Sequence, residues 1–408
     1  MPGTEATVFV LKLDLIQTLA IAASLYYLGV QLKRFLPLLD RLNIPSAVIG
    51  GLLFAGAVLV TRDRFVNFQF DTATQPLFMV AFFTTIGMSA SIPLLKTGGV
   101  GVLVFLIISS LFCFVQNFAG IGVAYLFDVN PLVGVMAGSV TLVGGPATGL
   151  AFAPLFEKAG VVGADTLAIT AATFGIVCGG LTGGPLGTWL IKRHSLRAKS
   201  TNVKELANEL SNQTETITIE VEKEDSSLVV NLIVASVAMG VGSIVSYYFQ
   251  SLGWTLPAYI GAMMVASLLR NIDDKTGWFK IDPKTMELIG GISLNIFLVV
   301  ALMNLKLWEL LNLAIPLFAI LAVQVVVVLA FAVVVYRAMG KNYDSAVIST
   351  GFIGFMLGTT ANAVANMKTL VAKFGPSPKA FLIVPMVGAF FIDFVNALVI
   401  TLYLNWFK

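Results

Sequence analysis

The chain has 408 residues, of which 57% are hydrophobic and only 12% charged, and its mean hydropathy is +0.91. Soluble globular domains carry about twice that share of charge, so the composition excludes a soluble protein and predicts a polytopic membrane protein. The net charge is only +3, and its basic residues lie in loops rather than on one face, which excludes nucleic acid as a partner.

The apolar runs predict an all-α membrane protein. A transmembrane helix needs about 20 mostly apolar residues. The sequence contains ten such runs, at 14–32, 44–60, 75–94, 99–127, 162–191, 227–250, 255–269, 285–304, 311–337 and 379–404. Two more apolar segments, 131–155 and 343–372, are interrupted by glycine, proline and polar residues. Interrupted backbone is tolerated in a bilayer only inside protein or beside water, so these two segments are predicted to be re-entrant hairpins.

Basic residues indicate the orientation of the spans. They follow the first, third, fifth, seventh and ninth spans, which places these five loops on the cytoplasmic side and both termini on the outer face. Arg62 and Arg64 are an exception, in a short outer loop. This orientation predicts that the first hairpin enters from outside and the second from inside.

Residues 192–226 form the only long polar segment and are predicted to be a cytoplasmic linker, with some helix around 203–210. The linker separates an N-terminal half, 1–191, from a C-terminal half, 227–408. His194 lies in this charged stretch, while Cys113 and Cys178 lie in apolar runs. The sequence therefore predicts neither a disulfide nor a metal site built on histidine and cysteine.

The two halves show a weak internal repeat. An offset that places Gly144 on Gly358 also places Thr148 on Asn362, and the order of spans and hairpin is the same in both halves. Because each half has an odd number of spans, the second copy must be inverted in the membrane. Inverted repeats with interrupted helices are typical of secondary transporters. The alternative is that both segments are glycine-rich packing helices.

The hairpin tips are the predicted binding elements. Gly144 and Gly358 are suited to end one half-helix, Pro146 suits the first turn of the next, and Thr359 or Thr360 can cap it. Each tip would aim free N–H groups and a positive helix end at the bilayer centre, where they can hold an anion without arginine. The alternative is two kinked helices with capped ends.

Asp393 is the one carboxylate that lies in the middle of a predicted span. A charge at that depth is costly and marks a functional site by default. Asn396, three residues later, shares its helix face and can offer a further oxygen to a cation or an ammonium group. The candidate substrate-binding residues are Thr141, Gly145, Pro146, Thr148, Gly149, Thr359, Thr360, Asn362, Asp393 and Asn396. The candidate cation ligands are Gly144, Gly358, Asn366, Asp393 and Thr84.

Several motifs are similar to those of one known family. They are AFFTTIGMSASI (81–92), QNFAGIGVA (116–124), the GG-x-x-TG tip (144–149), MGKNYDSAV (339–347), TANAVANM (360–367) and KAFLIVPMVGAFFIDFVNALVI (379–400). With them the chain resembles the bacterial sodium/glutamate symporter family over nearly its whole length. The resemblance implies a homodimer of inverted five-span repeats in the inner membrane, with outward termini. It also implies an elevator-type transporter that imports glutamate with Na⁺ as the coupling ion.

The chain departs from the family pattern at both tips. Pro146 and Ala147 stand where the family has His and Gly, Phe352 follows Gly351, and Ala361–Asn362 stands where Pro–Thr is expected. These changes remove polar contacts near the tips, so they bear on substrate preference more than on the fold or on Na⁺ coupling.

The hypothesis is a Na⁺-coupled symporter of L-glutamate or a close anionic amino acid. One alternative is a proton- or sodium-coupled carrier of another organic anion or dicarboxylate, with Asp393 as the proton carrier. A second is an integral-membrane enzyme, which needs a catalytic pair or cluster that the predicted spans lack. A channel is disfavoured because paired interrupted helices suit alternating access. The chain is therefore predicted not to be an enzyme.

Overall fold

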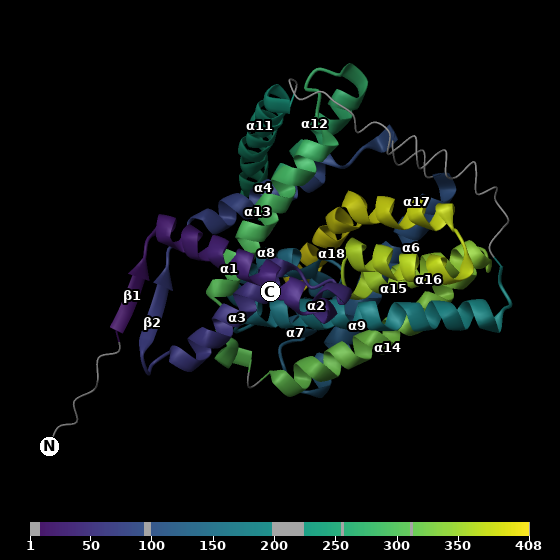
Figure 1. The fold of residues 1–408 in the computed structure, drawn as a ribbon, viewed down its shortest axis with the longest axis horizontal. Coiled ribbons are helices and arrows are strands. Elements are labelled where there is room, and N and C mark those ends of the chain that lie inside the picture. The colour runs from purple at the N-terminus through teal and green to yellow at the C-terminus, as the bar shows by residue number, and fades with distance from the viewer. Residues whose placement is uncertain (1–8, 94–98, 198–223, 254–256, 311–312, 408) are drawn as a thin grey trace.

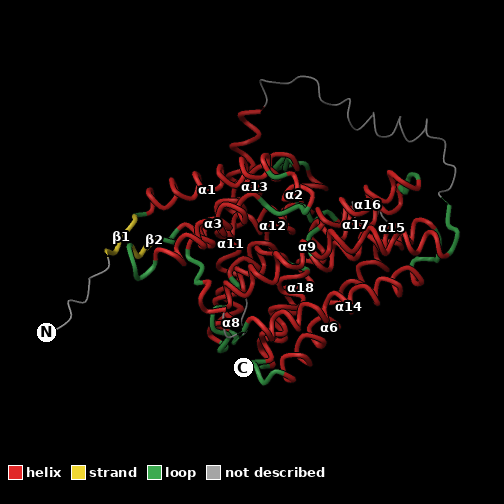
Figure 2. The backbone as a smooth tube through the Cα atoms, turned by 60° about the horizontal axis from the view of Figure 1, so that its bottom comes forward, coloured by secondary structure: helices red, strands yellow, loops and turns green. Residues whose placement is uncertain are grey.

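A computed structural model describes residues 9–93, 99–197, 224–253, 257–310 and 313–407. The described chain is almost entirely helical (Figure 2). Six described helices are long and apolar enough to cross a membrane. They are α1 (Leu15–Phe35), α6 (Gly99–Leu126), α9 (Ala164–Arg193), α11 (Glu224–Ser251, apolar from Leu228), α13 (Pro283–Met303) and α14 (Ala314–Ala338). The chain is therefore a multi-pass membrane protein, and the count of ten spans stays a prediction.

The other four expected spans are shorter or interrupted helices. They are α3 (Ser46–Thr61), α4 (Thr74–Met88), α12 (Ala258–Thr276) and a last helix divided into α17 (Pro378–Met386), η3 (Val387–Phe391) and α18 (Ile392–Trp406). Helix α4 ends at Met88, before the expected residue 94. Beyond that end, the Ile92 N–H donates to Asn271 Oδ1 at 2.9 Å and Ser91 Oγ to Asp274 Oδ2 at 2.6 Å. These bonds hold the chain against the end of α12.

The helices form two bundles that both halves of the sequence share (Figure 1). The first three helices of each half, α1, α3, α4, α11, α12 and α13, pack against one another in what we call the three-plus-three bundle. The later elements of each half, α6–α9 and α14–α18, form the hairpin bundle. The bundles meet where α8 (Gly145–Lys158) contacts α13, where α4 contacts η3, and where Phe152 lies edge-on to Tyr259.

Each half of the three-plus-three bundle begins with a close helix pair. A methyl group on Gly29 of α1 would lie 2.1 Å from Ser46 O of α3. A methyl group on Gly242 of α11 would lie 2.2 Å from Ala262 Cα of α12. Glycine is needed at both positions because only it lets the backbones approach this closely. The two pairs use the same packing device at matching places in the two halves.

The structure adds a small sheet that the sequence did not predict. Strand β1 (Phe9–Leu13) pairs in parallel with β2 (Val66–Phe70), with Phe9 opposite Val66 and Leu13 opposite Phe70. Phe68 and Phe70 both pack edge-on against Phe54 of α3, with centroid distances of 5.5 and 5.7 Å. Each strand has only five residues, too few to show a clear alternating pattern beside long apolar helices. The pairing also joins segments that are distant in the sequence.

The loops gather in two groups at opposite ends of the long helices. At one end the Arg62 guanidinium lies 3.7 Å from the Trp308 ring centroid, and Glu309 lies beside Gly163. At the other end His194 stacks on Tyr336. Helix α9, about 45 Å long at 1.5 Å per residue, joins the two ends. Three of the loops expected on the outer side therefore lie together, and so do two of the segments expected on the cytoplasmic side.

Most of the expected linker, including the helix around 203–210, lies outside the described residues. Helix α9 continues to Arg193 and α11 begins at Glu224, so the helices flanking the linker extend slightly into the range assigned to it.

Candidate functional site

The second hairpin is two helices joined by a two-residue break. Helix α15 (Tyr343–Leu357) ends at Gly358, and Thr359 is extended (φ −145°, ψ 169°) before α16 (Thr360–Phe374). Gly358 thus ends a half-helix as expected. The expected threonine cap is wrong, because Thr359 makes no side-chain capping bond and the Thr360 hydroxyl donates instead to Gly388 O at 3.1 Å. That bond ties the second tip to η3.

The first hairpin is interrupted twice, although the sequence suggested one break. Its first arm runs through α7 (Pro131–Val135) and η1 (Met136–Val140), with a kink at Gly138 (φ −104°, ψ −128°). A turn at 143–144 then leads into α8, whose first turn contains Pro146 as expected. Gly145 has φ +67°, the left-handed region that glycine enters at little cost.

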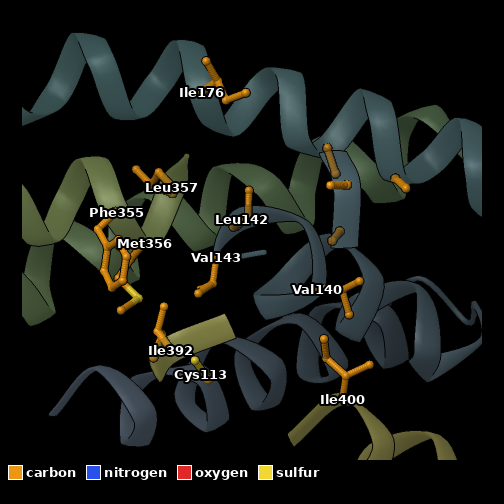
Figure 3. Close-up of a cluster of buried hydrophobic side chains, with 14 of the residues drawn as sticks. Cys113, Val140, Leu142, Val143, Ile176, Phe355, Met356, Leu357, Ile392 and Ile400 are labelled. Atoms are coloured by element: carbon orange, nitrogen blue, oxygen red, sulfur yellow. The ribbon is translucent and has the colours of Figure 1, made fainter. Parts of the chain in front are cut away.

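The two tips face each other. A methyl group added at Gly145 would lie 3.5 Å from Thr359 Cγ2 and 4.0 Å from Gly358 O, both on the second tip. Figure 3 shows Leu142 and Val143 of the first hairpin lying toward Met356 and Leu357 of the second. Segments about half the chain apart therefore meet at their breaks.

Asp393 lies in the first turn of α18, between Gly388, which binds Thr360 of the second tip, and Asn396, which binds Ser139 of the first hairpin. It is partly buried, and among the described residues its carboxylate has no hydrogen-bond or ion-pair partner. A carboxylate without a partner in such surroundings is costly unless a ligand compensates it.

Amide side chains repair the broken backbone of the first hairpin. The kink at Gly138 leaves the Ser139 N–H to bind Asn117 Oδ1 at 2.9 Å. Asn396 Nδ2 donates to Ser139 O at 2.8 Å and so links α18 to η1. The prediction that Asn396 shares a ligand-facing surface with Asp393 stays a prediction, and the structure shows that the Asn396 amide holds the kink in place.

Two glutamines hold the second tip, and neither was among the predicted site residues. Gln116 Nε2 of α6 donates to Met356 O at 2.8 Å, and Gln324 Nε2 of α14 donates to Gln116 O at 2.7 Å. Both side chains are fully buried. Their position in apolar spans could have identified them from the sequence, because a buried amide in a membrane helix needs a hydrogen-bond partner.

Several buried oxygen atoms have no hydrogen-bond partner in the described part of the chain. Among them are Oε1 of Gln116 and Gln324, Oδ1 of Asn362 and Asn396, and Oγ of Ser139. In each of these four amides the nitrogen is occupied by a main-chain carbonyl. Oxygen atoms of this kind are suitable ligands for a hard cation.

The remaining predicted residues have mainly structural contacts. Asn362 and Asn366 donate to Ile176 O and Gly179 O of α9, at 2.7 and 2.8 Å. The Thr141 hydroxyl donates to Met136 O within its own arm. Thr148 lies buried against Gly144, and Gly149 lies against Ala168 of α9. Thr84 lies in the three-plus-three bundle, where its hydroxyl donates to Val80 O of its own helix rather than across to a tip.

A stripe of glycines on α9 brings these parts together, and sequence reasoning missed it. The glycines at 175, 179, 183 and 187 lie one turn apart on one face. Methyl groups at Gly175 and Gly187 would lie 2.2 Å from Leu357 O and 2.0 Å from Thr350 Oγ1 of α15, and one at Gly183 would lie 2.2 Å from Asn366 Nδ2 of α16. The four-residue spacing was the signal, since small residues at this spacing mark close helix contacts in membranes.

Comparison with known proteins identifies the family. The profile of the sodium/glutamate symporters matches residues 11–376. The chain belongs to the sodium/glutamate symporter family. It is 42% identical to the sodium/glutamate symporter of Escherichia coli K12 over 397 residues, covering 96% of this chain and 98% of that protein. The corresponding protein of Haemophilus influenzae is 39% identical over 384 residues, covering 93% and 95%.

Among solved structures, the sodium proton antiporter of Methanocaldococcus jannaschii superposes with a TM-score of 0.42 at 15% identity, over 96% of this chain and 99% of that one. At this level the likeness carries no argument about the present chain. Family membership rests on the sequence relatives.

Proposed function

We propose that the chain imports L-glutamate, or a close anionic amino acid, coupled to Na⁺ and by alternating access. The observation that carries this proposal is the meeting of two broken hairpins beside the unpaired Asp393, in a member of the sodium/glutamate symporter family. Broken helices from two halves of a chain that meet at one place are the usual architecture of a secondary-transport site.

The substrate carboxylates are assigned to the two tips. Helices α8 and α16 both begin there, so their first N–H groups and positive dipole ends can hold an anion. Gly145 faces Thr359, and a substrate bound between the two tips would also meet the backbone around Pro146 and Thr360. The substrate ammonium group is assigned to Asp393, whose carboxylate is free to pair with it.

Na⁺ is carried as cargo, and oxygen atoms at the same place suit it. Asp393 and the main-chain carbonyls of Gly144 and Gly358 remain the candidate ligands at the tips. The unpaired Oδ1 of Asn396 is a further one, because its nitrogen is already fixed on Ser139 O. Asn366 and Thr84 are weaker candidates, because each side chain already binds a backbone carbonyl away from the tips.

The wider architecture is part of the proposal. Ten spans and two re-entrant hairpins form two inverted repeats, 1–191 and 227–408, joined by a cytoplasmic linker. The hairpin bundle moves against the three-plus-three bundle in an elevator motion, and the latter holds two copies together as a homodimer in the bacterial inner membrane, with outward termini. The interleaving of the two halves in both bundles supports this division. The chain is a carrier rather than an enzyme.

The test is uptake by purified protein in liposomes. We expect labelled glutamate to accumulate under an inward Na⁺ gradient and not when choline replaces Na⁺. Uptake that follows a proton gradient without Na⁺ would contradict the coupling and favour the proton-coupled alternative. Competition by unlabelled aspartate and by dicarboxylates then ranks the substrates, which the changes at Pro146, Ala147 and Asn362 are expected to affect.

A further inference from the structure

A cavity at one end of the hairpin bundle has the chemistry of an anion site. It has a volume of about 780 Å³ and lies between the last turns of α9 and α14 and the loops that follow them. It is lined by Trp189, Leu190, Arg193, His194, Leu196, Val333, Tyr336, Arg337 and Lys341. Three of these residues are cationic and none is acidic. This is the end of the molecule at which the sequence predicts the cytoplasmic face.

Contacts between the two helices build the walls of this cavity. His194 stacks on Tyr336, with ring centroids 5.3 Å apart and planes at 27°. The Tyr336 hydroxyl donates to Lys341 O at 3.2 Å, and the Lys341 N–H donates to Tyr336 O at 3.1 Å. These bonds fold the loop after α14 back over the last turn of its own helix, which places the backbone of Lys341 at the cavity.

The charges in the cavity are available to a ligand. Arg193, Arg337 and Lys341 are exposed, and no ion pair joins any of them to another described residue. The helix ends themselves contribute about half a negative charge each. Three cations against about one negative charge leave about two positive charges facing the cavity, more than the helix ends require.

The surroundings match a lipid better than a soluble anion. Trp189 is 51% exposed at the rim, and tryptophan and tyrosine concentrate where membrane meets water. Leu190, Leu196 and Val333 form an apolar part of the lining, which suits the glycerol and first acyl carbons of a lipid. Basic pockets between membrane helices on the cytoplasmic side are typical sites for anionic headgroups.

We propose that this cavity binds the phosphate headgroup of an anionic phospholipid, with Arg193, Arg337 and Lys341 as its cationic ligands. Nothing in the transport site requires such a group, and the proposal is independent of which substrate the chain carries. A lipid held there bridges α9, which carries the glycine stripe against both hairpin tips, and α14, which precedes the second hairpin.

The test counts lipids bound to the purified protein by native mass spectrometry, with phosphatidylglycerol as the probe and phosphatidylcholine as the comparison. A surface cation is worth about 1 kcal/mol toward an anionic lipid, which is about fivefold in affinity. We therefore expect each of Arg193→Gln, Arg337→Gln and Lys341→Gln to weaken phosphatidylglycerol binding about fivefold, and the triple variant on the order of a hundredfold.

The matched control is Arg34→Gln, Arg41→Gln and Lys275→Gln together, which removes the same charge from exposed positions outside the cavity and is expected to keep the lipid. Equal loss in both triple variants, or equal binding of phosphatidylcholine, would overturn the proposal. Displacement of the lipid by millimolar inorganic phosphate would instead assign the cavity to a soluble anion and refute the lipid. If the triple variant does not fold, the three single variants decide.

Discussion

At the scale of single residues, the proposed site combines one carboxylate with a set of amides that make different contacts. Asp393 has no partner among the described residues, whereas Asn362, Asn366 and Asn396 each donate to a main-chain carbonyl. The sequence picked out all four because each is polar in an apolar run. It did not show that Asp393 lacks a described partner while the asparagines bind main-chain carbonyls, because that depends on which carbonyl lies opposite each side chain.

Asp393→Asn is the sharpest single substitution. It keeps the size of the side chain and removes its charge, which at about 4 Å from a cation in a partly buried site is worth about 4 kcal/mol, or about a thousandfold in affinity. We expect Na⁺-dependent glutamate uptake in liposomes to be lost while the size-exclusion profile stays unchanged. Asp128→Asn, in an exposed loop, is the control and should transport normally. Wild-type Na⁺ dependence in Asp393→Asn would remove this residue from the site.

At the scale of elements, both hairpins show how a helix can be interrupted inside a membrane protein. The freed Ser139 N–H and C=O are satisfied by Asn117 and Asn396, and Met356 O near the second tip is satisfied by Gln116. An unpaired backbone group in a membrane costs several kcal/mol. The interrupted helices therefore need the amide side chains that neighbouring helices supply. The spacing of glycine, proline and threonine predicted both tips. It did not predict the π-helical segment η1 in the first arm of the first hairpin.

The glycine stripe of α9 gives a prediction at this scale. Gly175→Ala would place a methyl group 2.2 Å from Leu357 O and 2.6 Å from Leu142 Cδ2, so both hairpin tips would have to shift. Overpacking of this kind costs about 1–3 kcal/mol, and we expect a lower thermal midpoint in detergent together with slower uptake. Gly180→Ala lies on the same helix with nothing within 4 Å of the added methyl group. It should be neutral or slightly stabilising, because alanine favours helix over glycine by about 1 kcal/mol. Equal effects of the two substitutions would contradict the role of the stripe.

At the scale of the whole molecule, the two bundles cut across the two halves of the sequence. Helix α13 runs from the end where Asp274 binds Ser91 to the end where Arg62 lies over Trp308. The basic loops predict that these two ends face opposite sides of the membrane, with the end that carries Asp274 in the cytoplasm.

Labelling of single cysteines tests that assignment. With Cys113 and Cys178 replaced by alanine, Arg64→Cys and Lys275→Cys place one exposed thiol at each end. We expect a membrane-impermeant maleimide to label Arg64→Cys in intact cells and Lys275→Cys only after the cells are permeabilised. The reverse pattern would invert the orientation. Labelling of both without permeabilisation would show that the two ends do not lie on opposite sides.

The sequence alone determined the membrane class, the family and the positions of the two tips, and it singled out Asp393 as a candidate. These follow from composition, from span length and from the cost of breaking a helix or placing a charge in lipid, all of which are local properties. Only the tertiary structure decided that Gly145 meets Thr359, that the two halves share both bundles, and that β1 pairs with β2. Those contacts join segments far apart in the chain, and they depend on shape and on hydrogen-bond partners that no local pattern encodes.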